Sequence, residues 1–121
     1  MKISKEVIAC CYYYAEKVYG RQIERTNATN LIFNEVEMNQ GSAGDYIEAF
    51  RSMMNGERYT RTINTEATRY YLENIEKDFG FDQLKIALKA VELHTEYYGN
   101  LGRGHLRSIE KVVEEYKAIM Y

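Results

Sequence analysis

The stretch SAGDYIEAFRSMMN, residues 42–55, decides the fold class. Its apolar side chains return every three or four positions, which is the period of an α-helix with one buried face. We expect this helix to begin at Ser42, with Asp45 in its first turn interacting favourably with the helix dipole. Asn55-Gly56 is a typical helix end. The apolar face consists of Ala43, Tyr46, Ile47, Phe50 and Met54.

The same period continues in both directions and predicts about six helices, separated by short Gly/Asn breaks. Residues 57–64 are expected to form a loop, because no second strand is visible to pair with them. The other helices are expected from about Ser4 to Tyr19, from near Asn27 to residues 38–41, from Asn64 or Thr65 to Phe79-Gly80, from about Asp82 to Tyr98, and after the flexible turn of residues 99–104. We therefore predict one compact all-α domain over residues 1–121, with an orthogonal or bundle-like arrangement. Its core is expected to contain Tyr46, Phe50, Leu72, Ile75, Leu88, Val91 and Ile109.

Composition sets limits on the class of protein. The chain has 121 residues, 45% of them hydrophobic and 28% charged, which suits one folded domain. A net charge of -2 excludes a strongly basic nucleic-acid binder and a strongly acidic DNA mimic, but leaves a local basic face open. The sequence shows no signal peptide and no membrane-spanning apolar run of about 18 residues. The adjacent Cys10 and Cys11 cannot form an ordinary disulfide with each other, so we expect reduced thiols, a cytoplasmic protein and no membrane partner.

No catalytic pattern is visible. His94 lies near the apolar stripe of the fifth helix and is expected to be packed in the core. His105 is expected to open the last helix and to contact solvent or an anion. Neither histidine has the company of ligands at zinc-site spacing, and no nucleophile–histidine–acid set is recognisable. We therefore expect no enzymatic activity, no catalytic residue, no metal, no cofactor and no small-molecule substrate.

Three segments carry side chains of the kind used in recognition. In the first, the helices around residues 38–41 have the form of a helix-turn-helix, and Gln40 and Ser42 are expected at the exposed start of the second helix. Gln can pair with adenine, Ser can reach a phosphate, and a small residue such as Gly44 permits close approach. The alternative is an ordinary pair of helices joined by a glycine turn.

The second segment surrounds the loop of residues 57–64. Arginine suits phosphate, and tyrosine can stack on a base or on a partner side chain. The alternative is a solvated loop in which the arginines pair with Glu48, Glu57 and Glu66. The candidate residues are Arg51, Arg58, Tyr59, Arg61 and Arg69. The third segment, Arg103, His105 and Arg107, follows glycines ahead of a helix N-terminus, which favours an anion.

Three stretches of the chain have a sequence specific enough for comparison with known families. They are residues 38–71, MNQGSAGDYIEAFRSMMNGERYTRTINTEATRYY, and the later stretches LENIEKDFG and VELHTEYYGNLGRG. About the last two-thirds of the chain thus resembles a small helical domain at the N-terminus of predicted bacterial HNH-type restriction endonucleases. The resemblance implies a role in target recognition, with the nuclease part absent after Tyr121. We therefore expect a non-catalytic module for DNA recognition. The alternative is a phage or mobile-element protein that binds and inhibits a host nuclease, as anti-CRISPR or anti-restriction proteins do, which near-neutral charge and 12 tyrosines also suit.

Overall fold

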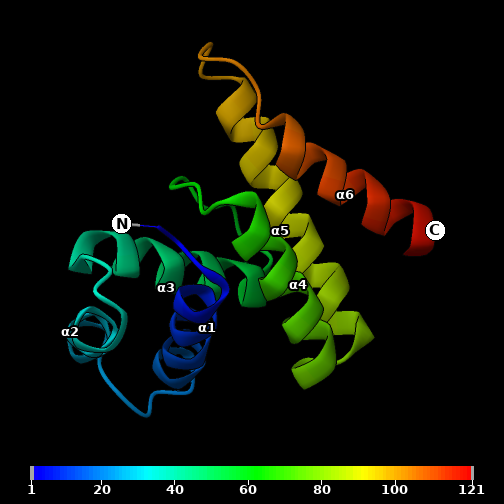
Figure 1. Ribbon diagram of the computed structural model, residues 1–121. Coiled ribbons are helices and arrows are strands. Elements are labelled where there is room, and N and C mark those ends of the chain that lie inside the picture. The colour runs from blue at the N-terminus through cyan, green and yellow to red at the C-terminus, as the bar shows by residue number, and fades with distance from the viewer. Residues whose placement is uncertain (1, 121) are drawn as a thin grey trace. The chain divides into compact units, whose positions relative to one another are not determined.

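Six α-helices account for the regular structure of residues 2–120, which the computed structural model describes (Figure 1). No strand occurs among these residues, so the predicted all-α class and the loop at residues 57–64 are confirmed. The helices are α1 (Lys5–Tyr19), α2 (Arg25–Val36), α3 (Gln40–Asn55), α4 (Thr65–Phe79), α5 (Phe81–Gly99) and α6 (Arg107–Met120). None of them is both long enough and apolar enough to span a membrane.

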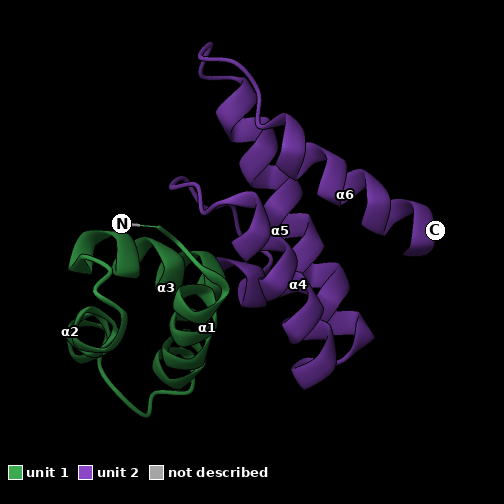
Figure 2. Ribbon diagram, viewed as in Figure 1, with its two compact units in different colours: residues 1–51 green, residues 52–121 purple. Residues whose placement is uncertain are grey.

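The chain divides into two compact units, Met1–Arg51 as unit 1 and Ser52–Tyr121 as unit 2 (Figure 2). Unit 1 holds α1, α2 and most of α3, and unit 2 holds α4, α5 and α6. The end of α3 belongs to unit 2, because this helix continues to Asn55.

Helix starts in unit 1 follow side chains that accept hydrogen bonds from free backbone N–H groups. The Ser4 hydroxyl accepts from the Val7 amide at 3.4 Å, so α1 begins where the sequence predicted. The start of α3 differs from the prediction, because Asn39 accepts from the Ser42 amide at 2.8 Å through its side chain. Ser42 is therefore inside the first turn, and the helix begins two residues earlier, at Gln40.

The core of unit 1 combines aromatic and sulfur-containing side chains. The rings of Tyr12 and Phe50 meet edge to face with 5.3 Å between their centroids. The sulfur atoms of Cys11 and Met38 lie 3.6 Å apart. Tyr46 and Phe50 are 4% and 0% exposed, which confirms their predicted burial.

In unit 2, α5 packs against both α4 and α6. Asn64 caps α4 by accepting a hydrogen bond from the Ala67 amide at 2.7 Å. Gly80 joins α4 to α5 with a φ of 97°, a conformation that other residues rarely adopt. The predicted core positions of this unit are all buried, namely Leu72, Ile75, Leu88, Val91 and Ile109.

Candidate functional site

The loop of residues 57–64 turns some of its predicted recognition side chains outward and one inward. Arg58 and Arg61 are exposed, whereas Tyr59 is only 4% exposed. The Tyr59 ring stacks on the His94 ring, with centroids 4.3 Å apart and planes 13° apart. The prediction that Tyr59 is a surface anchor is therefore wrong: its ring has more apolar surface to bury than its neighbours and occupies the interior of unit 2.

His94 connects α5 to this loop. As predicted, it is packed in the core, with 0% of its surface exposed. Its Nδ1 lies 2.6 Å from the backbone oxygen of Tyr59, and its Nε2 lies 2.9 Å from the hydroxyl of Thr62. Burial lowers the pKa of His94, opposed by the hydrogen bond to Tyr59. The imidazole is thus held neutral between two points of the loop.

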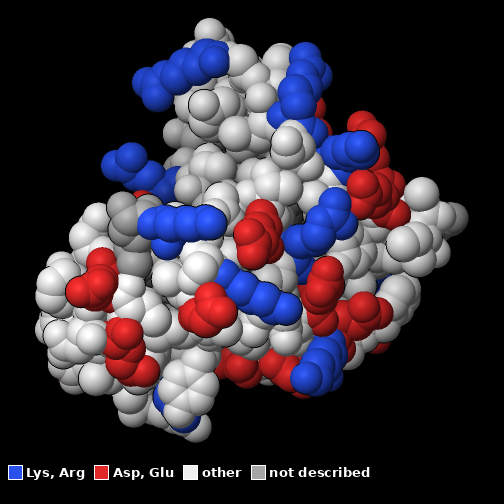
Figure 3. Space-filling model, in the orientation of Figure 1, with Lys and Arg blue, Asp and Glu red and all other residues white. Residues whose placement is uncertain are grey.

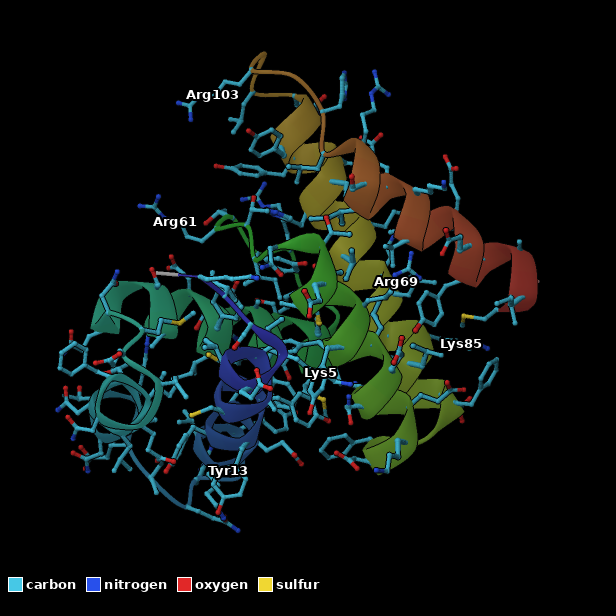
Figure 4. All side chains as sticks on the ribbon, viewed as in Figure 1. Lys5, Tyr13, Arg61, Arg69, Lys85 and Arg103 are labelled. Carbon is cyan, nitrogen blue, oxygen red and sulfur yellow. The ribbon has the colours of Figure 1, made fainter. Side chains whose placement is uncertain are left out.

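The two outward arginines of the loop have different surroundings. The Arg58 guanidinium lies over the ring of Tyr97 at 4.6 Å from its centroid. Arg61 has no hydrogen bond or ion pair within residues 2–120 and extends into solvent (Figure 4). Sequence reasoning missed Tyr97, although it lies three residues after His94 and so shares a side of α5 with it.

The loop of residues 100–106 carries the third predicted set. Arg103 lies between Gly102 and Gly104, whose φ angles of 77° and 111° let the backbone reverse sharply around it. Like Arg61, Arg103 has no ion-pair partner in the described part of the chain, and the two arginines extend to the same side of unit 2 (Figure 4).

His105 and Arg107 share an acidic neighbour on α6. Glu110 lies 3.7 Å from Nδ1 of His105 and 3.5 Å from Nη1 of Arg107. The predicted helix start is corrected here, because α6 begins at Arg107 and His105 stands two residues ahead of it. Its imidazole rests on Gly99, where an added Cβ would lie 2.9 Å from Nδ1, so close packing fixes the ring beside α5.

In Figure 1 the tips of the two loops stand apart on unit 2, and the segments that follow the tips come together at one pocket. A shallow pocket of about 410 Å³ lies between the start of α4 and the start of α6. Its polar lining comes from both segments: Thr62, Asn64, Thr65, His105, Arg107 and Ser108. Residues 57–64 and 100–107 together contain four arginines and one glutamate. We call the surface of these two segments the loop end; the second predicted set contributes only Arg58 and Arg61 to it. Figure 3 shows basic side chains at the upper end of unit 2 with mostly neutral surface between them.

An acidic groove borders the loop end. A second pocket, of about 560 Å³, runs between α5 and α6 and shares His105 with the first. Its charged lining consists of four glutamates and one lysine: Glu92, Glu96, Glu110, Glu114 and Lys117. The basic surface therefore ends at His105, and a polyanion is favoured on the loops and disfavoured along the groove.

Arg51 and Arg69 are not part of the loop end. Arg69 of α4 pairs with Glu115 of α6 at 2.8 Å, a partner outside the three glutamates that the solvated alternative named. Arg51 belongs to unit 1 and pairs with Glu48 at 2.5 Å, as the solvated alternative predicted. Both arginines have carboxylate partners on their own unit.

The helix-turn-helix-like pair lies within unit 1. Gln40 is exposed and Ser42 is half-buried, so both reach solvent at the start of α3. Gly44 does not, because the Arg25 side chain of α2 covers it and would lie 2.9 Å from an added Cβ. The prediction of an open, small-residue surface is therefore wrong at Gly44: packing between α2 and α3 uses the space that its missing side chain leaves.

The described residues contain no group of three or more His, Cys, Asp or Glu side chains that could hold a metal ion. Comparisons of the chain with protein-family models, with curated proteins and with solved structures found no match.

Proposed function

We propose that this chain is a non-catalytic binding module that contacts the phosphates of DNA with the loop end of unit 2. The observation that supports the proposal is the pocket at the starts of α4 and α6, which is lined by the ends of two arginine-bearing loops that are distant in sequence. Arginine is suited to phosphate by its fixed fork of donors, and helix N-termini add free backbone N–H groups. The resemblance of residues 38–80 and 91–104 to the HNH-associated helical domain supports the same target class.

Arg61 and Arg103 are the side chains best placed to supply the charge. Neither has an ion-pair partner among residues 2–120, so no internal bond is lost when they contact a phosphate. Arg58 adds a third charge and stays exposed above the Tyr97 ring. Because the guanidinium already rests on the Tyr97 ring, the Arg58 side chain loses less conformational freedom on binding than an arginine without such a contact.

The test is salt-dependent binding of the Arg61→Ala/Arg103→Ala double variant to a fluorescent duplex, measured by anisotropy. Each lost phosphate contact should make the slope of log affinity against log salt about 0.9 less negative, so the slope of the double variant should be about 1.8 less negative than that of the wild type. Affinity should fall for all sequences alike, because phosphate contacts do not read bases. Arg69→Ala is the matched control, since Arg69 is an arginine of the same unit already paired with Glu115. A double variant with the wild-type slope and affinity would refute the proposal.

The alternative function, inhibition of a host nuclease by direct binding, is favoured by the chain's overall charge of -2. A chain of this charge gains no long-range attraction to DNA, whereas a basic protein surface attracts it. In that case the wild-type chain should bind no duplex and should form a complex with the nuclease. Absence of cleavage with magnesium or manganese is expected under both functions. Sustained cleavage that one carboxylate substitution abolishes would contradict both.

A further inference from the structure

The loop of residues 57–64 is held in place by one buried side chain, His94 of α5. The His94 Nδ1 faces a backbone carbonyl, which can only accept a hydrogen bond, so Nδ1 must carry the proton and donate to Tyr59. Nε2 then carries a lone pair and accepts the Thr62 hydroxyl proton at 2.9 Å. Both nitrogens of a neutral imidazole are therefore satisfied, and the bonding pattern is defined by chemistry.

These two hydrogen bonds fix the loop at two residues, each of which directly follows an arginine. Arg58 precedes one anchored residue, Tyr59, and Arg61 precedes the other, Thr62. Stacking of His94 on the Tyr59 ring adds a third contact to the same segment. The backbone on which both arginines stand is thus tied to α5, which also carries Tyr97 under the Arg58 guanidinium.

We propose that His94 is a positioning residue for the loop end: it touches no ligand and holds Arg58 and Arg61 in the arrangement that binds phosphate. The inference rests on the proposed function. A loop of eight residues without these contacts would lose conformational entropy when it became ordered on binding. A loop that is already held in place does not lose that entropy.

Thr62 gives access to this anchor from the surface. Thr62 is exposed, so a substitution at this position does not create a cavity in the core. Thr62→Val keeps the branched shape but removes the hydroxyl that donates to His94, whereas Thr62→Ser keeps the hydroxyl. We expect Thr62→Val to weaken duplex binding about threefold to tenfold, the effect of one hydrogen bond, and Thr62→Ser to stay within about twofold of wild type.

A double-mutant cycle separates an indirect role from direct contact with DNA, because Thr62 also lines the pocket. His94→Asn retains an amide donor near the position of Nδ1 but has no counterpart of Nε2. If Thr62 acts through His94, Thr62→Val should cause no further loss in the His94→Asn background. The same loss in both backgrounds would show that Thr62 contacts the ligand itself, and would overturn the inference.

Hydrogen–deuterium exchange of the free protein gives a readout that does not depend on any ligand. Amides of residues 57–64 should exchange faster in Thr62→Val than in Thr62→Ser, while those of α4 and α5 stay unchanged. If His94→Asn fails to fold, loop exchange in the two Thr62 variants, together with their affinities for the duplex, still tests the positioning role of His94. Unchanged loop exchange in Thr62→Val refutes the positioning role. A wild-type chain that binds no duplex refutes the proposed function, and loop exchange then decides separately whether His94 anchors the loop.

Discussion

Removing the hydroxyl of Tyr59 should stabilise the protein. This residue is 4% exposed, and its hydroxyl oxygen is the one buried side-chain N or O atom without a hydrogen-bond partner among the described residues. Burial alone raises the pKa of Tyr59, with no charged neighbour contributing. The hydroxyl has therefore lost its water contacts on folding and gained no protein contact in return.

The size of the effect follows from two opposed contributions. Burying a hydroxyl without a partner costs about 1–3 kcal/mol, and Tyr59→Phe relieves that cost while keeping the ring stacked on His94. The space left by one oxygen atom costs part of this gain. We expect a net gain of about 1 kcal/mol in the free energy of unfolding, which for a chain of 121 residues raises Tm by about 3–5 °C. Tyr59→Ala should instead lose about 3–5 kcal/mol, because the ring itself is removed from the core.

Urea unfolding followed by circular dichroism measures these differences, provided that the slope with denaturant is unchanged. Tyr14→Phe is the matched control, since the Tyr14 hydroxyl donates to Glu35 at an exposed position. That variant should lose less than about 1 kcal/mol, so the two Tyr→Phe changes should differ in sign. Destabilisation by Tyr59→Phe of more than about 1 kcal/mol would prove that the hydroxyl has a partner in solution, and the reasoning would fail.

The remaining predictions concern the core, the buried histidine and the thiols. Leu88→Ala should cost about 2–5 kcal/mol in urea unfolding, because Leu88 is 3% exposed, and a loss below about 1 kcal/mol would contradict the packing of α5. Because the pKa of His94 is lowered from its ordinary value of 6.5, the unfolded chain takes up a proton there before the folded chain does. The free energy of unfolding should therefore fall as pH drops below 6.5, and this part of the pH dependence should be missing in His94→Asn, as urea titrations at several pH values would reveal. Burial raises the pKa of Cys10 to about 11 and of Cys11 to about 12, so a thiol reagent should label the native protein slowly at pH near 8 and rapidly only in denaturant; fast labelling of both thiols without denaturant is the contrary result.

The helices were predictable because their ends are local features. Ser4, Gly20 and Asn64 act within a few residues of themselves, and each ends or begins a helix where the sequence placed it. Ser42 was misjudged for an equally local reason: Asn39, three residues earlier, is itself a capping residue, and its side chain accepts a hydrogen bond from the Ser42 amide. Choosing between two capping residues that are three positions apart depends on backbone angles that composition does not specify.

The candidate site was predictable only in its parts. Arg58, Arg61, Arg103 and Arg107 were singled out by residue type, but nothing in the order of the chain shows that two loops about 40 residues apart share one pocket. That proximity comes from the packing of α4 and α6 against α5. Tyr59 was assigned to the surface because it stands among charged residues, and its burial depends on His94, which lies 35 positions later.

A net charge of -2 does not oppose phosphate binding at the loop end, because salt screens charges beyond about 8–10 Å. Only nearby groups act on a bound phosphate. Glu110 lies 3.5 Å from Arg107 and offsets part of its charge, and the acidic groove disfavours a polyanion beside the loops. Under the proposed function, the three remaining arginines, at positions 58, 61 and 103, should give a slope of log affinity against log salt of about -2.7. A slope of that size corresponds to a small basic surface that contacts one stretch of the DNA backbone. A much steeper slope would require basic residues outside the loop end.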